Sequence, residues 1–292
     1  MKKTTRRGIE ATLFILPLLT LVLFVAIPLV QAVIMSFSDY DMLSGSREHA
    51  FVGLDNYQTV WEKARFWKMA AITGWYTLWS VFGKMLLGLI VALLLNAKFR
   101  GKGILRSLLV IPWAMPGIVV AFLFTLFLDS EYGVMNALLL ALKLVPEGVP
   151  FISRADIALP VVILIGVWKN FPFVALMLLA ALQNIPKELY EAADVDGAKP
   201  LQKFFRITWP MTFSVWFIML ILQLVGTIKE FDLVYLVTGG GPALATNLVG
   251  LDIYDQSFRF FKLGIASAEG ILLMLLSLIL AFIYYRYEFR KR

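Results

Sequence analysis

The segment YEAADVDGAKPLQKFFRITWP, Tyr190–Pro210, is charged, whereas almost everything on either side of it is apolar. The residues leading into it favour a helix start, with Asn184 as a possible N-cap and Pro186 in the first turn. Gly197 can end that helix in a left-handed conformation, and Pro200 can begin a second one. The segment therefore predicts two short helices joined at a glycine.

Six long apolar runs surround this segment. The chain has 292 residues, of which 60% are hydrophobic and only 16% charged, whereas a soluble domain has about 25% charged residues. Each run is at least roughly 20 residues long, enough to cross a hydrocarbon layer of about 30 Å as a helix. We therefore expect an all-α polytopic membrane protein with six transmembrane helices in one domain, residues 1–292. The expected spans are 10–36, 69–97, 105–128, 157–185, 207–237 and 264–286, with a loop at 185–208.

Three local features refine this picture. The first run follows the basic stretch MKKTTRR, as in a signal peptide, but it is too long and lacks a small-residue cleavage site, so a retained helix is expected. The shorter run Gly133–Val145 contains Lys143 and is expected to lie at the membrane interface. Pro112 and Pro116 remove backbone hydrogen bonds from the third span, which should therefore bend.

Lysine and arginine residues predict the orientation of the chain. The two termini and the loops after the second and fourth spans carry sixteen of them, whereas the three opposite loops carry eight. Because positive charge concentrates on the cytoplasmic side, we expect both termini and the loop at 185–208 to be cytoplasmic. This segregation accounts for the net charge of +7 and argues against nucleic-acid binding.

Several kinds of chemistry are not expected in this chain. It has no cysteine, and its one histidine, His49, has no neighbouring ligand candidates in the sequence, so neither thiol chemistry nor a metal site is expected. The glycine-rich stretch TGGGP lacks the lysine of a phosphate-binding loop and falls on the outward side. We therefore expect no bound cofactor, no catalytic residue and no enzymatic activity.

Two interpretations of the charged segment remain open on physical grounds. Phe204 and Phe205 would suit a helix that lies on the lipid surface. Ala192 and Ala193, beside acidic residues, insert poorly into an anionic leaflet and suit close docking against another protein. Docking accounts better for the first half of the segment.

The spacing of this segment resembles the EAA loop of ABC-importer permeases, with Trp209 where that family prefers leucine. Three other stretches, FVGLDNY, FRGKGILRSLLVIPWAMP and FDLVYLVTGGGP, resemble in order the sugar-type permeases of the maltose and glycerol-3-phosphate importer class. The resemblance extends over nearly the whole chain. The residues that match the EAA loop are Glu191, Ala192, Ala193, Gly197, Ile207 and Pro210.

This resemblance implies the type I ABC importer permease fold and a role in transport. Such a subunit forms half of the translocation pathway for a carbohydrate, here an oligosaccharide or disaccharide, by alternating access. The EAA loop couples it to two separate ATPase subunits, which bind the ATP and magnesium. The other implied partners are a second, different permease subunit and an extracytoplasmic solute-binding protein. The implied location is the cytoplasmic membrane of a bacterium or archaeon.

Polar residues within the fourth and fifth spans are candidates for the transport pathway. A charge at the bilayer centre costs about 2.5–3.5 kcal/mol on insertion scales, so such residues face protein or water. The alternative is that Lys169 and Glu230 pair with each other, or with Lys229 or Asp232, and only stabilise the packing. For Lys84 in the second span a structural ion pair is expected. The pathway candidates are Lys169, Asn170, Phe173, Gln223, Thr227 and Glu230.

Other transport functions and substrates compete with this prediction. Lys169 would suit an anionic substrate such as glycerol-3-phosphate, whereas Glu230 in the same stripe favours a neutral sugar. An ion-gradient-driven secondary transporter would need a mid-membrane carboxylate or histidine relay, for which the spans offer only Glu230 and Glu269. A non-transporting membrane scaffold would give the polar stripes no purpose.

Overall fold

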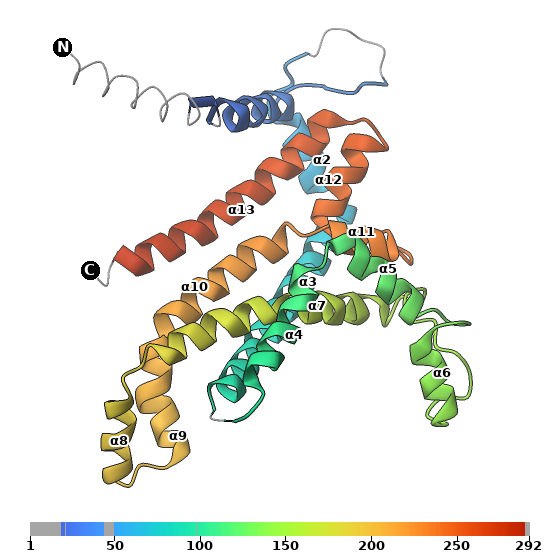
Figure 1. Ribbon diagram of the computed structural model, residues 1–292. Coiled ribbons are helices and arrows are strands. Elements are labelled where there is room, and N and C mark those ends of the chain that lie inside the picture. The colour runs from blue at the N-terminus through green and yellow to red at the C-terminus, as the bar shows by residue number, and fades with distance from the viewer. Residues whose placement is uncertain (1–18, 21, 44–49, 98, 290–292) are drawn as a thin grey trace, which may run out of the picture. The chain divides into compact units, whose positions relative to one another are not determined.

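The computed structural model describes all of the chain except residues 1–18, 21, 44–49, 98 and 290–292. The described residues are mainly helical, as predicted (Figure 1). They fall into two compact units. The first unit comprises residues Met1–Phe66 and Asp252–Met274, and the second comprises Trp67–Leu251 and Leu275–Arg292.

The first unit is held together by short polar contacts around its loops. Asn56 Nδ2 donates hydrogen bonds to the carbonyl oxygens of Ser36 and Ser38. Arg65 Nη2 lies 2.7 Å from Asp252 Oδ1, and the side chain of Asp252 is buried. The helical parts of this unit are Val22–Ser36, α2 (Asp55–Glu62), most of α12 (Val249–Phe258) and the first part of α13 (Leu263–Phe289).

The second unit contains the remaining helices. Its longest members are α3, α7 and α10. The elements are α3 (Ala64–Asn96, nearly all of it in this unit), α4 (Lys102–Ala114), α5 (Gly117–Phe127), α6 (Val134–Ala141), α7 (Ala158–Gln183), α8 (Lys187–Val195), α9 (Pro200–Lys203), a π-helix (Phe204–Thr208), α10 (Trp209–Ile228) and α11 (Asp232–Thr238).

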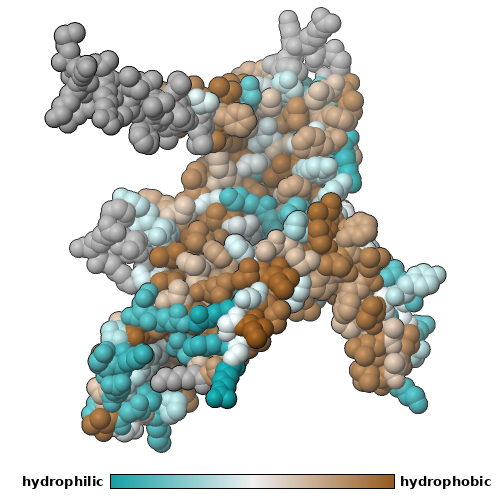
Figure 2. Space-filling model, in the orientation of Figure 1, coloured by the Kyte–Doolittle hydropathy of each residue, from teal (hydrophilic) through white to brown (hydrophobic). Residues whose placement is uncertain are grey.

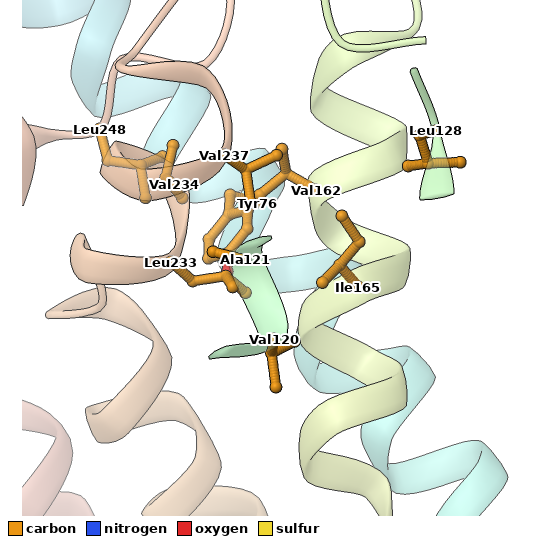
Figure 3. Packing of buried hydrophobic residues seen from close by; sticks show 10 residues of the cluster. All are labelled: Tyr76, Val120, Ala121, Leu128, Val162, Ile165, Leu233, Val234, Val237 and Leu248. Carbon is orange, nitrogen blue, oxygen red and sulfur yellow. The ribbon is translucent and has the colours of Figure 1, made fainter. Parts of the chain in front are cut away.

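Apolar side chains from four helices form a core in the second unit, and Figure 3 shows how they meet. Tyr76 of α3 lies among residues of α5, α7 and α11, and its side chain is fully buried. The labelled residues are Tyr76, Val120, Ala121, Leu128, Val162, Ile165, Leu233, Val234, Val237 and Leu248.

Close approach between α3 and α7 depends on small residues. A Cβ atom at Gly88 would lie 2.6 Å from Cγ1 of Val174 and 3.2 Å from the backbone nitrogen of Ala175. One turn and a half earlier, a Cβ atom at Gly83 would lie 2.7 Å from Val167. Glycine lets membrane helices approach this closely, so the two helices pack as a tight pair.

The expected bend in the third span is confirmed. α4 ends at Ala114 and α5 begins at Gly117, and the axes of the two helices differ by 95°. Pro116 caps α5, and its ring cannot donate the hydrogen bond that would continue α4.

Among the described residues, four helices are long and apolar enough to cross a membrane by length and composition, and the bent pair would add a fifth. The first expected span, 10–36, lies partly outside the described residues, which include only its portion Val22–Ser36 as an apolar helix. The number of six spans therefore stays a prediction. The four helices are Ala64–Asn96, Ala158–Gln183, Pro200–Ile228 and Leu263–Arg286.

The fifth expected span differs from its sequence prediction at both ends. The helix is continuous from Pro200 to Ile228, because α9, the π-helix and α10 follow one another without a break. It then stops, and a separate helix begins at Asp232. Asp232 lies in the first turn of α11, where a carboxylate favours the positive end of a new helix.

Candidate functional site

The charged segment folds as a helical hairpin made of α8 and the beginning of the long helix that starts at Pro200. Gly197 has φ +71° and ends α8 as predicted. Its N–H donates to the carbonyl of Asp194, and the N–H of Ala198 donates to that of Ala193, which is the hydrogen-bond pattern of a Schellman motif. α8 and α9 lie side by side at the lower left of Figure 1.

The predicted N-cap of the hairpin is wrong. Asn184 is the C-cap of α7, and Pro186 precedes α8, which begins at Lys187. A residue before proline is driven away from helical backbone angles, so Ile185 separates the two helices. The buried side chain of Ile185 packs into the core that α3, α7 and α10 share.

The hairpin enters α10 through five π-helical residues, Phe204–Thr208. The N–H of Trp209 donates to the carbonyl of Phe204, five residues earlier. Pro210 has no N–H to donate to the carbonyl of Arg206, and its ring would collide with that carbonyl in an α-helix. The proline of the EAA motif thus accounts for the wider turn.

Two side-chain contacts join the arms of the hairpin. The hydroxyl groups of Tyr190 and Thr208 share a hydrogen bond of 2.8 Å. Nearer the tip, Lys203 Nζ pairs with Asp194. Residue numbers rise along α8 from Tyr190 to Asp194 and fall along the other arm from Thr208 to Lys203, so the two helical arms are antiparallel.

The outer surface of the hairpin exposes apolar side chains between charges. No residue of α8 is buried, and Val195 is 89% exposed. Of the EAA residues, Glu191 and Ala192 are exposed, whereas Ala193 and Ile207 are half-buried. Figure 2 shows hydrophilic residues gathered over α8 and α9, below mostly hydrophobic helices. The other exposed apolar residues of the hairpin are Leu189, Leu201 and Phe205.

A second site lies farther along α10, in a cavity of about 260 Å³. The structure brings together five of the six predicted pathway residues at this cavity, with the side chains coming from α7, from α10 and from the break that follows α10. Its lining residues are Lys84, Lys169, Asn170, Leu222, Gln223, Gly226, Thr227 and Glu230.

The sixth pathway candidate, Phe173, is not among these lining residues. Its ring stacks on that of Trp113 with centroids 5.3 Å apart. About one and a half turns earlier on α7, Trp168 packs edge-on against Phe124 of α5. The aromatic residues of this part of α7 therefore contact α4 and α5.

Lys84 is the charged residue lining the cavity that was not predicted as a pathway residue. Its side chain is 2% exposed. Nζ donates a hydrogen bond of 2.9 Å to Thr227 Oγ1 and lies 3.6 Å from Glu230 Oε2. The expected ion pair of Lys84 is thus present, and its partner is Glu230. A lysine within an apolar span was the only sequence signal for this residue, and it did not identify the partner.

The other polar groups of the cavity are less constrained. In the described part of the chain, Lys169 has no carboxylate within ion-pair distance. The predicted alternative, a pair between Lys169 and Glu230, is therefore not formed. Asn170 Nδ2 donates to the carbonyl of Gly166, one turn earlier on α7, which leaves its Oδ1 oxygen as an available acceptor.

Comparison with known proteins assigns the family. The model of the binding-protein-dependent transport system inner membrane component family matches residues 84–292, which include both the hairpin and the cavity. The chain belongs to this family. The resemblance inferred from the EAA motif is thereby confirmed, and the protein is a permease subunit of the ABC-importer type.

Two curated relatives extend along nearly the whole permease. It is 37% identical to the trehalose/maltose transport system permease protein MalF of Thermococcus litoralis, over 93% of this chain and 91% of the relative. It is 35% identical to the sulfoquinovosyl glycerol transport system permease protein SmoG of Agrobacterium fabrum, over 90% and 85% of the two chains.

The fold of the permease matches solved structures. A chain of a bacterial ABC transporter involved in the import of the acidic polysaccharide alginate superposes with a TM-score of 0.85 at 23% identity, over 99% of this chain and 98% of that one. A chain of a bacterial alginate ABC transporter in complex with its alginate-bound periplasmic protein superposes with a TM-score of 0.82 at 24% identity. This match covers 97% of this chain and 94% of that one. The type I importer fold expected from the sequence is confirmed.

Proposed function

We propose that this permease forms half of the translocation pathway for a carbohydrate and that separate ATPase subunits drive it through the α8–α10 hairpin. One observation carries the proposal. A single helix, unbroken from Pro200 to Ile228, has the exposed hairpin at one end and the cavity residues Gln223 and Thr227 at the other. Motion imposed on the hairpin would reach the cavity directly.

The hairpin has the surface that docking into another protein requires. Exposed apolar residues at helical spacing, flanked by acidic ones, suit a helix that seats in a groove. In this proposal Glu191, Ala192, Ala193 and Gly197 form the ATPase-coupling tip, and Ile207 and Pro210 fix the start of α10. ATP and magnesium would be bound by the ATPase subunits. The hairpin would face the cytoplasm of a bacterium or archaeon, as the distribution of lysine and arginine indicates.

The cavity has the chemistry for binding a sugar. Asn170 and Gln223 supply amide groups, Thr227 a hydroxyl group and Glu230 a carboxylate, which together can donate to and accept from sugar hydroxyls. The cavity is small for a disaccharide, and a second permease subunit would enlarge it. An extracytoplasmic solute-binding protein would deliver the substrate. The names of both curated relatives support a carbohydrate.

One observation favours a second substrate class, a carbohydrate that carries an anionic group. The negative charge of Glu230 was the argument for a neutral substrate. Glu230 lies close to Lys84, which neutralises that charge. Lys169 lines the cavity without a carboxylate partner among the described residues. A carboxylate, sulfonate or phosphate group on the substrate could pair with it.

The test is uptake by proteoliposomes that contain the permease together with its second permease, its ATPase subunits and its binding protein. Uptake of labelled trehalose, maltose or sulfoquinovosyl glycerol should require internal ATP. The variant Glu191→Ala should abolish uptake while the permease remains folded. Uptake driven by a proton gradient alone, or a Glu191→Ala variant that transports normally with its ATPase bound, would contradict the proposal.

A further inference from the structure

Two contacts join the arms of the hairpin across Gly197, and they differ in strength. The pair Asp194–Lys203 is near the tip, and the aspartate side chain is 63% exposed. Exposed ion pairs contribute little, because water screens them and ordering two long side chains has an entropic cost. This contact alone would not prevent the arms from bending at the glycine.

The second contact, between Tyr190 and Thr208, lies in a more buried setting. Thr208 is buried and Tyr190 half-buried, and the tyrosine ring packs against the core formed by α3, α7 and α10. A hydrogen bond is stronger where water is excluded. The bond between these hydroxyls is therefore the firmer of the two connections.

Thr208 is also the last residue of the π-helix. Its hydroxyl oxygen lies 3.5 Å from the carbonyl of Lys203, five residues earlier, and Thr212 Oγ1 donates to the carbonyl of Thr208 at 2.8 Å. A π turn is rare and occurs as an isolated single turn within an α-helix, often at functional sites. Side-chain hydroxyls thus support this turn from both sides.

We propose that Tyr190 is a positioning residue that makes α8 and α10 move as one body. Its bond to Thr208 bypasses the glycine, so a displacement of α8 enters α10 at the π turn and is not absorbed at Gly197. This inference rests on the proposed coupling through the hairpin and adds to it a side chain outside the EAA motif.

The first test measures the rigidity of the hairpin and needs no substrate. The chain contains no cysteine, so spin labels can be placed at Glu188→Cys of α8 and Met211→Cys of α10, both exposed positions, with cysteines of the partner chains replaced. In the assembled transporter, the distance distribution should be narrow and the same without nucleotide and with ATP, magnesium and vanadate. Tyr190→Phe should broaden or shift it. An unchanged distribution in Tyr190→Phe, or a wild-type distance that changes between the two states, would overturn the inference.

The second test measures coupling as ATP hydrolysed per labelled trehalose molecule imported. Tyr190→Phe and Thr208→Val each remove one hydrogen bond. Each should therefore raise the number of ATP molecules hydrolysed per imported trehalose molecule by roughly threefold to tenfold. Thr208→Ser, which keeps the hydroxyl, should behave as wild type, as should the matched control Tyr132→Phe at a fully exposed tyrosine. The double variant Tyr190→Phe/Thr208→Val should be no worse than either single one.

A purely structural role for Tyr190 would give a different pattern. Thermal stability, ATP hydrolysis and uptake would fall together. The number of ATP molecules hydrolysed per trehalose molecule imported would stay constant, which would contradict the inference. If the wild-type transporter showed no ATP-dependent uptake, the proposed function would fail instead. The spin-label distances would then still decide whether Tyr190 makes the hairpin rigid.

Discussion

Lys84 of α3 and Glu230, which follows α10, form an ion pair across the cavity wall, with Nζ 3.6 Å from Oε2. The pair joins α3 to the short break between α10 and α11. The positive charge of Lys84 neutralises the Glu230 carboxylate, which lines the cavity. Lys169 is then the cation of the cavity that is available to a ligand. The electrostatics of this site thus follow from a residue on a third helix.

Removing Lys84 should destabilise the permease. Lys84→Met leaves the largely buried Glu230 carboxylate without its counter-ion, which costs about 3–5 kcal/mol for a buried pair. The double variant Lys84→Met/Glu230→Gln should recover much of this loss. Thermal unfolding in detergent, followed by size-exclusion fluorescence, measures both effects. Equal instability in the single and double variants would contradict the pairing.

Lys169 should distinguish the two substrate classes. For an anionic carbohydrate, Lys169→Gln should raise KM by about tenfold, as expected when a charge-assisted hydrogen bond is lost. For a neutral sugar, KM should change by less than about threefold. Lys229→Gln is the control, because Lys229 is exposed and does not line the cavity. Initial rates of ATP-dependent uptake provide the measurement.

Gly197 should tolerate asparagine but not valine. Its φ of +71° is a left-handed conformation, which asparagine adopts readily and β-branched residues avoid. A Cβ atom at this position meets nothing within 4 Å, so backbone strain alone decides the outcome. Gly197→Val should reduce ATP-dependent uptake several-fold, whereas Gly197→Asn should keep most of it. Normal uptake by the valine variant would show that the hairpin does not need this turn.

Two glycines of α3 form a matched pair for testing its packing on α7. Gly88→Ala places a methyl group 2.6 Å from Val174, and overpacking of this kind costs about 1–3 kcal/mol. Gly74→Ala meets nothing within 4 Å and should be neutral or stabilise the helix by up to about 1 kcal/mol. Gly88→Ala should therefore lower the unfolding temperature, whereas Gly74→Ala should leave it unchanged or raise it.

Asp255 of α12 should make stability depend on pH. Burial raises the pKa of its carboxyl group; Arg259 opposes this rise and Asp252 adds to it. Because the folded state holds the proton more tightly, the group's stabilising contribution is full below its unfolded pKa of 3.8 and is lost as pH rises through the folded pKa. Asp255→Asn should therefore gain stability relative to wild type as pH increases above 3.8, as unfolding curves at several pH values would show.

The sequence predicted the helices and the hairpin because their signals are local. The signals are the long apolar runs, the glycine at 197 and the proline at 200, which act through their immediate neighbours. Where the structure describes these segments, it has helices or a turn. Asn184 was misassigned because two signals competed there, and the end of α7 prevailed over the start of α8. The position of Pro210 was part of the recognised motif, but its effect on the preceding turn was not foreseen.

The cavity was predicted only in part because its contacts connect distant segments. The positions of Gln223 and Thr227 follow from helical periodicity, and Lys169 with Asn170 follows from polarity within a span. Glu230 was predicted from the same periodicity but lies in the break after α10. The partner of Lys84 lies on another helix, which periodicity cannot identify. Phe173 stacks on Trp113 of α4 and does not line this cavity, so its place in the pathway stays a prediction.

The π turn at Phe204–Thr208 has a consequence for the angular register of the long helix. In an α-helix each residue turns the chain by about 100°, and a π turn contains one residue more than an α turn. The five residues of the π turn therefore complete about the same rotation as four residues of an α-helix. The extra residue is thus accommodated without turning the hairpin relative to Gln223 and Thr227. Elsewhere in α10, inserting or deleting one residue would rotate the hairpin by about 100° around the helix axis relative to these cavity residues.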